Sequence, residues 1–190
     1  MKKSFTLAAT AIAMSLATAG CMTTASMDND VAYIDGAAMY ANQNIIENAS
    51  NSPIHTTLVA AVKQAQLVDT LSGPGPFTVF APTDEAFAKV PPAMLDAAMQ
   101  DANRPLLQKV LTYHVVPGRI TAADLMERIR AGGGKAMVAT VAGEQLTFSM
   151  MGDQVMIMGK NNSMAHVTQA DVMQSNGVIH VVDGVLTPSM

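Results

Sequence analysis

The sequence predicts an α+β domain, with helices in its first half and strands in its second. Apolar residues first recur at helical spacing, and from about residue 137 short β-type runs alternate with Gly or Asn turns. Because helices and strands are segregated rather than alternating, α+β is favoured over a parallel α/β sheet. The chain has 190 residues without an internal repeat, and 49% of them are hydrophobic, so one packed domain is expected.

The first expected element is an export leader. Met1-Lys2-Lys3 is a basic start, and the apolar run from Phe5 to Ala19 is too short to span a bilayer. Residues 1–20 are therefore predicted to be a bacterial signal peptide rather than a transmembrane anchor.

The leader ends at Cys21, which is the only cysteine in the chain. The segment Leu16-Ala-Thr-Ala-Gly-Cys21 resembles a lipobox, in which the cysteine is acylated and becomes the new N-terminus. This predicts a membrane partner through a lipid anchor, at the outer membrane or the cell surface. Ordinary cleavage after Ala19 is the alternative, and it would leave a soluble periplasmic or secreted protein.

Residues 21–41 are predicted to form a flexible tether, and residues 42–188 to form the folded domain. The segment after Cys21 is small and polar, which is typical of a linker. Removal of Lys2 and Lys3 with the leader would leave 9 basic and 15 acidic residues, a net charge of −6. A surface of that sign repels phosphate backbones, so nucleic acid is not an expected partner.

Four helices are expected before residue 131, and turn-forming residues mark their ends. The expected helices are 56–66, 83–90, a segment that follows Pro105, and 121–130. Thr83 and the acids after it are typical of a helix start, and the prolines that follow end that helix. The helix after Pro105 is expected to bury Leu106. Thr121 and Asp124 resemble a capping box, and the glycine run from residue 132 ends the last helix.

Short strands are expected between these helices and after them in the sequence. The expected strands are 77–80, 113–116, 137–141, 145–151, 154–158, 165–172 and 178–183. They place His114, His166 and His180 in strands. Because His180 stands in a nearly continuous apolar run, we expect it to be a hydrogen-bonded core residue, and we expect the same of His114.

Motifs of catalysis and cofactor binding are missing from the sequence. It contains no H-E-x-x-H, C-x-x-C or G-x-S-x-G, and the glycine run before Lys135 is followed by Ala136, so it is not a phosphate-binding P-loop. No enzymatic activity, no cofactor and no catalytic residue are therefore expected.

Three segments together resemble the fasciclin domain. They are Phe77–Phe87, Leu111–Val116 and Asn176–Leu186, and their order and spacing fit the family from about Asn42 to Pro188. The resemblance implies a wedge or sandwich of about seven β-strands with several helices packed on one side. It also implies adhesion or matrix contact through protein or glycan partners, without catalysis or a required cofactor.

The resemblance marks four residues for interaction with a partner. In some animal members an Asp-Ile pair and the Tyr-His motif are tied to integrin binding, and here Asp171-Val172 and Tyr113-His114 match those places, with Val172 departing from isoleucine. The alternative is structural. Asp171 would then cap the turn before Gly177, while Tyr113 and His114 would support the core.

Methionines form a feature that is independent of the family. The chain has 16, and six lie between Met150 and Met173. If Gly152 and Asp153 form a two-residue hairpin turn, residues whose numbers sum to 305 face one another. The register places Leu146, Phe148, Met150, Val155 and Ile157 on the core face, and Met151, Met156 and Met158 on the other. We expect those three to form an adaptable contact surface or to pack under a helix; the alternative is a Cu(I) site with His166.

These observations predict a non-enzymatic extracytoplasmic fasciclin-domain protein that mediates adhesion or contact with a surface or matrix. The alternative function is a periplasmic metal-handling or small-ligand-binding protein. A methionine face that is open to solvent and converges on His166 would favour metal handling. A broad exposed apolar patch elsewhere would favour adhesion.

Overall fold

The computed structural model describes residues 31–189. Its α-helices are α1 (Ile45–Asn51), α2 (Thr56–Gln64), α3 (Val68–Ser72), α4 (Asp84–Ala88), α5 (Pro92–Ala98), α6 (Arg104–Tyr113) and α7 (Ala122–Ala131). Its strands are β1 (Val31–Ile34), β2 (Ala37–Tyr40), β3 (Phe77–Pro82), β4 (Val115–Pro117), β5 (Lys135–Ala139), β6 (Gln145–Met151), β7 (Gln154–Met158), β8 (Met164–Gln174) and β9 (Gly177–Val182). Within this part of the chain no helix combines the length and hydrophobicity needed to cross a membrane.

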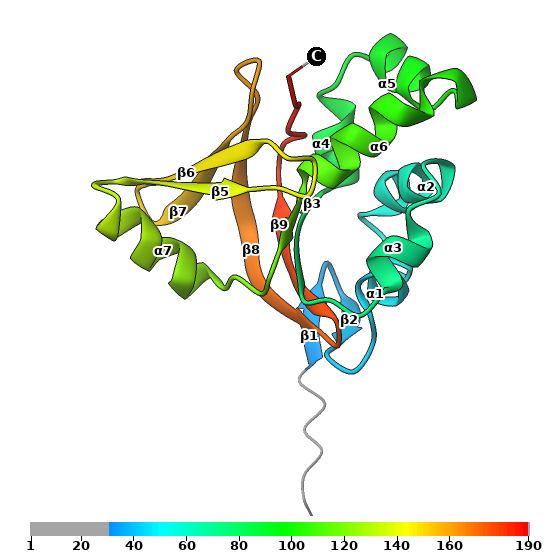
Figure 1. Cartoon of the computed structure of the whole chain (residues 1–190). Coiled ribbons are helices and arrows are strands. Elements are labelled where there is room, and N and C mark those ends of the chain that lie inside the picture. Colours follow the sequence, from blue (N-terminus) through cyan, green and yellow to red (C-terminus); the bar gives the residue numbers. More distant parts are fainter. Residues whose placement is uncertain (1–30, 190) are drawn as a thin grey trace, which may run out of the picture.

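A seven-stranded sheet in the order β4-β3-β9-β8-β7-β6-β5 forms the centre of the molecule. Figure 1 shows α1 to α6 gathered on one side of it and α7 on the other. The long strand β8 joins the two halves of the sheet, because one end pairs with β7 and the other with β9. The predicted fold, with seven strands and helices packed beside them, is confirmed.

Each side of the sheet has its own hydrophobic core. In the first, apolar side chains of α1, α2, α3 and α6 pack against β3 and β9. In the second, Leu125 and Ile129 of α7 belong to one cluster with Leu146, Phe148 and Ile157 of the β6–β7 hairpin. Burial of each such side chain contributes about 1.5–3 kcal/mol. The second core uses one face of the β5–β8 half of the sheet, and the opposite face is turned away from it.

The first and last of the three fasciclin-like segments form neighbouring strands of the sheet, between β4 and β8. β3 and β9 pair in parallel from Phe77↔Gly177 to Pro82↔Val182. A Cβ atom at Gly177 would lie only 2.0 Å from the carbonyl oxygen of Phe77, so this close pairing requires glycine. The two segments are therefore paired core strands, and Thr83 starts α4 directly after β3 by accepting a hydrogen bond from the Ala86 N–H.

The folded region begins earlier than expected, which corrects the 21–41 tether. β1 and β2 form an antiparallel hairpin that buries Ile34 and Met39. Asp35 and Gly36 both have positive φ, as a two-residue hairpin turn of type I′ requires. Gln169 of β8 donates a hydrogen bond to the carbonyl of Tyr33, so the hairpin is joined to the main sheet. The expected leader, Cys21 and the first part of the tether lie outside the described residues.

Three expectations about the helices are corrected. The helix from Thr56 ends at Gln64, because Gln66 takes a left-handed conformation and α3 then starts separately. His114 lies at the C-cap of α6 rather than in a strand. Leu106, which was expected in the core, is exposed on α6. By contrast, the capping box at Thr121 is present as predicted.

The β6–β7 hairpin has the predicted register. Phe148 faces Ile157 and Ser149 faces Met156, so paired residue numbers sum to 305. One assignment within it is wrong: Met150 is exposed rather than buried. It pairs with Val155 one position before the last pair of the ladder, Met151↔Gln154, which adjoins the turn.

Candidate interaction surfaces

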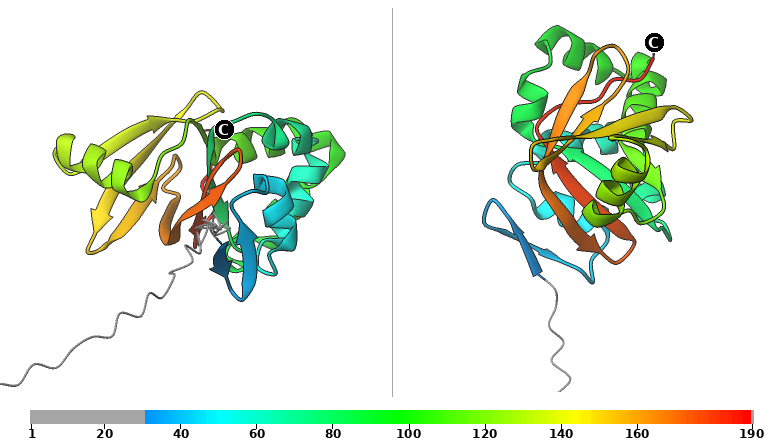
Figure 2. Two further views of the ribbon diagram at one scale, coloured as in Figure 1. Left: turned by 90° about the horizontal axis from the view of Figure 1, so that it is seen from below. Right: turned by 90° about the vertical axis from the view of Figure 1, so that its left-hand side faces the viewer.

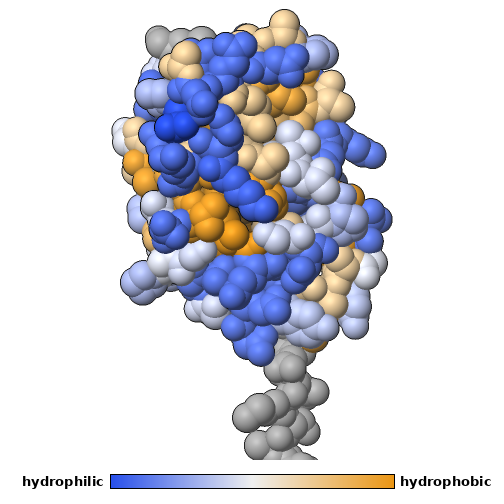
Figure 3. Space-filling model, turned by 90° about the vertical axis from the view of Figure 1, so that its right-hand side faces the viewer, coloured by the Kyte–Doolittle hydropathy of each residue, from blue (hydrophilic) through white to orange (hydrophobic). Residues whose placement is uncertain are grey.

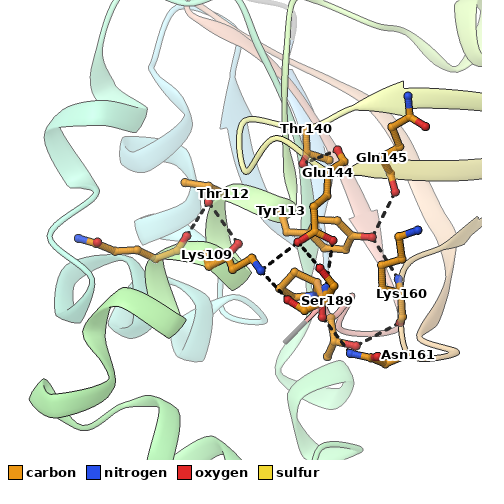
Figure 4. A network of polar contacts seen from close by, with 12 residues as sticks. Lys109, Thr112, Tyr113, Thr140, Glu144, Gln145, Lys160, Asn161 and Ser189 are labelled. Atoms are coloured by element: carbon orange, nitrogen blue, oxygen red, sulfur yellow. Dashed lines mark hydrogen bonds and ion pairs between the residues drawn. The ribbon is translucent and has the colours of Figure 1, made fainter.

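Tyr113 of the Tyr-His motif lies in the second core and links three segments. Its hydroxyl donates to the carbonyl of Gln145 at 3.3 Å and accepts from the N–H of Lys160 at 3.1 Å (Figure 4). Burial raises the pKa of Tyr113. The side chain is fully buried, so in this structure it is not available to a partner.

An ion pair beside Tyr113 holds the segment that follows β9 (Figure 4). Lys109 lies 3.0 Å from Glu144, which also accepts hydrogen bonds from the N–H and hydroxyl of Ser189. Those bonds from Ser189, together with Lys109, hold the pKa of Glu144 at about 2. The arrangement joins α6, the β5–β6 turn and residue 189, so its role is structural.

His114 is also a core residue, as the sequence predicted. Its Nδ1–H donates to the carbonyl of Val110 at 2.8 Å, and its Nε2 accepts from the N–H of Leu186 at 2.9 Å. Burial lowers the pKa of His114 to about 4, so the ring is neutral at pH 7. Both nitrogens have partners inside the fold, and the ring therefore connects the end of α6 to the segment after β9.

Asp171 and Val172 lie at the irregular part of β8. Val172 is fully buried. Asp171 is half-buried with φ of 58°, and its carboxylate accepts from the first N–H of α7, that of Ala122, at 2.8 Å. Asp171 therefore provides a hydrogen-bond acceptor for a free N–H group at the start of α7. This corrects the expectation that it caps the turn before Gly177.

His180 is in the core with both ring nitrogens hydrogen-bonded, as predicted. Its Nε2–H donates to the carbonyl of Ile120 at 2.9 Å, and its Nδ1 accepts from the N–H of Asp171 at 3.3 Å. The ring stacks on Phe80. Burial lowers the pKa of His180, and the ring is thus a neutral bridge between β9, β8 and the start of α7.

The outward face of β5–β8 gathers five methionines and a histidine, which we call the methionine face. Its members are Met137, Met151, Met156, Met158, Met164 and His166. The strand register places Met137, Thr147, Met158 and Met164 in one cross-strand row, and Ser149, Met156 and His166 in the next. Met137 is 67% exposed and Met164 is 57% exposed, so this face is not covered by a helix. Sequence analysis had found Met151, Met156 and Met158 but had missed Met137 and Met164.

A second surface feature is an apolar groove between α5, α6 and the segment after β9, which we call the helical groove. Its volume is about 220 Å³, and the side chains that line it include Met94, Leu95, Leu106, Val110 and Pro188. Figure 3 looks at the helical side and shows hydrophobic residues in its upper part, at the level of α5 and α6, and a second strongly hydrophobic patch nearer the middle. The groove was not predicted, because it depends on how three segments pack.

Metal-binding groups of the common kinds do not gather anywhere in residues 31–189. No three His, Cys, Asp or Glu side chains in this range lie close enough together to hold an ion. The two surfaces that remain as candidates are the methionine face and the helical groove.

The comparisons with known proteins agree with the fold. The fasciclin domain model matches residues 53–188. Protein sll1483 of Synechocystis is 45% identical over 159 residues, covering 84% of this chain and 81% of that protein. The cell surface glycolipoprotein MPB83 of Mycobacterium bovis is 34% identical over 188 residues, covering 88% of this chain and 78% of that protein.

A solved structure has the same architecture. It is a FAS1 domain pair from the insect cell adhesion molecule Fasciclin I, which matches with a TM-score of 0.67 and 20% identity over 76% of this chain and 50% of that one. At that identity the likeness concerns the fold alone. The match of the domain model to residues 53–188 establishes that the chain belongs to the fasciclin domain family.

Proposed function

We propose that this protein is an exported, lipid-anchored fasciclin module that contacts a protein at a cell surface or matrix through its helical groove, without catalysis. The observation that carries the proposal is the open apolar groove on the helical side. Export is supported by the leader-like N-terminus and by the similarity to a cell surface glycolipoprotein.

The chemistry of the groove favours a protein partner over a glycan. Met94 is 50% exposed, and Leu106 beside it is also exposed, in a groove whose other lining side chains are apolar apart from Thr187. Exposed apolar grooves of this kind accept large apolar side chains, which supply most of the binding energy at protein interfaces. A sugar would offer mainly hydroxyl groups, which an apolar lining leaves without partners.

The position of the groove fits anchoring through Cys21. β1 lies at the opposite end of the molecule from α5 and α6 (Figure 1; Figure 2). Nine residues separate Cys21 from Val31, a span of at most roughly 30–36 Å when extended. Attachment at Cys21 would therefore hold the β1 end near the membrane and turn the groove outward.

The test compares full-length variants displayed on cells. Lysines at Met94 and Leu106 place two charges in the groove at exposed helix positions, so they should leave the fold intact. Adherence to cells of the same strain that lack the chain should fall at least tenfold in the double variant Met94→Lys/Leu106→Lys. The matched control is Met137→Lys, an exposed methionine on the other surface, which should adhere as the unmodified chain does. Equal adherence of the double variant and the control would contradict the proposal.

The anchor is tested separately by Cys21→Ser and cell fractionation. The unmodified chain should sediment with the membranes, and the variant should move to the soluble fraction. If both chains distribute equally between the fractions, Cys21 carries no lipid and only the anchoring part of the proposal fails.

A further inference from the structure

Four side chains of the methionine face form a compact block on β7 and β8. Met156 faces His166 and Met158 faces Met164 across the two antiparallel strands. Facing residues have Cβ atoms about 5 Å apart, and residues two apart on one strand are separated by about 7 Å. Three thioethers and one imidazole therefore rise from the corners of one small patch of sheet. The methionine side chain has three rotatable bonds, which lets the sulfur atoms turn toward a common point.

His166 is oriented as a metal-binding histidine would be. Its Nδ1 lies 3.3 Å from a carboxylate oxygen of Asp183, and its backbone N–H donates to the other oxygen at 2.7 Å. Lys89 lies 3.9 Å from the same carboxylate. Among residues 31–189, Nε2 of His166 has no hydrogen-bond partner. A carboxylate that accepts from one ring nitrogen leaves the lone pair on the other nitrogen for a metal.

The block is accessible from solvent. The side chain of His166 is 30% exposed, Met164 is exposed, and Met156 and Met158 are half-buried. Val155 and Ile157 alternate with these methionines along β7 and point to the other face of the sheet. They are buried in the second core and hold the strand in place. A rigid strand pair with flexible, partly exposed ligands admits an ion without opening the fold.

From this geometry we propose that Met156, Met158, Met164 and His166 form a binding site for Cu(I). Thioethers are soft, neutral ligands that select Cu(I) over harder divalent ions, and imidazole also binds copper. The proposal concerns other residues than those of the helical groove, so either can fail without the other. Binding requires no change of oxidation state and releases no proton from the methionines.

The site is tested with Cu(I) titrated without oxygen against a colorimetric Cu(I) chelator. The full-length chain with Cys21→Ser is used, so that the thiol cannot bind the ion. We expect one Cu(I) per chain bound at the block, with thioether sulfur and imidazole nitrogen visible by X-ray absorption. The triple variant Met156→Leu/Met158→Leu/Met164→Leu should lose at least tenfold in affinity. Leucine keeps the volume and the apolar surface while removing the sulfur, so melting should change little.

Two methionines on the same face provide the matched control. Met137 lies two strands away from Met158, and Met151 lies beside the hairpin turn, so neither belongs to the block. Met137→Leu/Met151→Leu should bind Cu(I) as the parent chain does, and His166→Ala should bind more weakly. Equal affinity of the triple variant and this control, or an absorption signal without nitrogen, would overturn the proposal. Cell adherence should be unchanged in the triple variant, because leucine retains the apolar surface.

Discussion

The two ends of β8 differ in a way that explains what the sequence motifs record. At one end, Asp171 and Val172 are packed against β9 and α7, and each polar group has a partner within the fold. At the other end, Met164 and His166 face solvent beside β7, and no motif marks them. The recognisable residues thus describe how the fold is built. The surface that is free to bind something is specified by strand register alone.

The physical cause is the different penalty for change at the two ends. A buried polar group that loses its partner costs about 1–3 kcal/mol, whereas surface substitutions usually change stability by less than about 0.5 kcal/mol. The Tyr113-His114 and Asp171-Val172 pairs therefore read as structural elements of this chain. Any role in binding a partner stays a prediction for them, and in this structure three of these side chains are buried.

The largest expected effect in this comparison concerns the pH dependence of folding stability. Burial lowers the pKa of His114 to about 4, and it lowers the pKa values of His55 and His180 as well. The unfolded chain therefore binds more protons below pH 6.5, and stability is complete above that value and falls as pH drops toward 4. The shift at His114 alone corresponds to about 3 kcal/mol.

Urea unfolding at pH 7 and pH 4.5 measures this loss. His114→Gln removes one titrating ring from the core, so the difference between the two pH values should shrink by about 2–3 kcal/mol. Identical pH profiles for the parent chain and His114→Gln would contradict the assignment of a neutral buried ring.

A smaller effect is expected from truncating one buried and one partly exposed histidine. His180→Ala removes two hydrogen bonds and leaves a cavity beside Phe80, so the free energy of unfolding should fall by about 1–3 kcal/mol. His166→Ala should change it by less than about 0.5 kcal/mol. Thermal melts of both variants provide the measurement. If His180→Ala melts like the parent chain but loses a bound metal, the core assignment of that ring is wrong.

Local signals were sufficient to predict much of the fold. The capping box of Thr121 with Asp124 and the Gly152-Asp153 turn depend on neighbouring residues, and the structure has both. The apolar run around His180 likewise identified a strand that is buried on both faces. In such cases the residues that determine the local structure are close together in the sequence.

Features that depend on distant packing were missed. The helical groove requires α5, α6 and residues 185–188 to meet, which no local pattern reveals. The pairing of Met156 with His166 requires knowing that β8 lies beside β7. The β1–β2 hairpin is a different case, because Asp35-Gly36 is a recognised turn signal that the expected tether obscured.

The smallest expected effect on stability concerns Met151, Met156 and Met158. All three lie on the outward face of the β6–β7 hairpin, and replacing them with Thr should change the free energy of unfolding by no more than about 0.5 kcal/mol per site, since β-branched polar residues suit an exposed strand. Phe148→Thr on the opposite, buried face should instead cost several kcal/mol. Cu(I) affinity should fall in the triple Thr variant, because it removes two of the four proposed ligands, and adherence should be retained, because the groove is untouched. If adherence falls instead, the methionine face contacts the partner, and thioether flexibility serves recognition rather than metal binding.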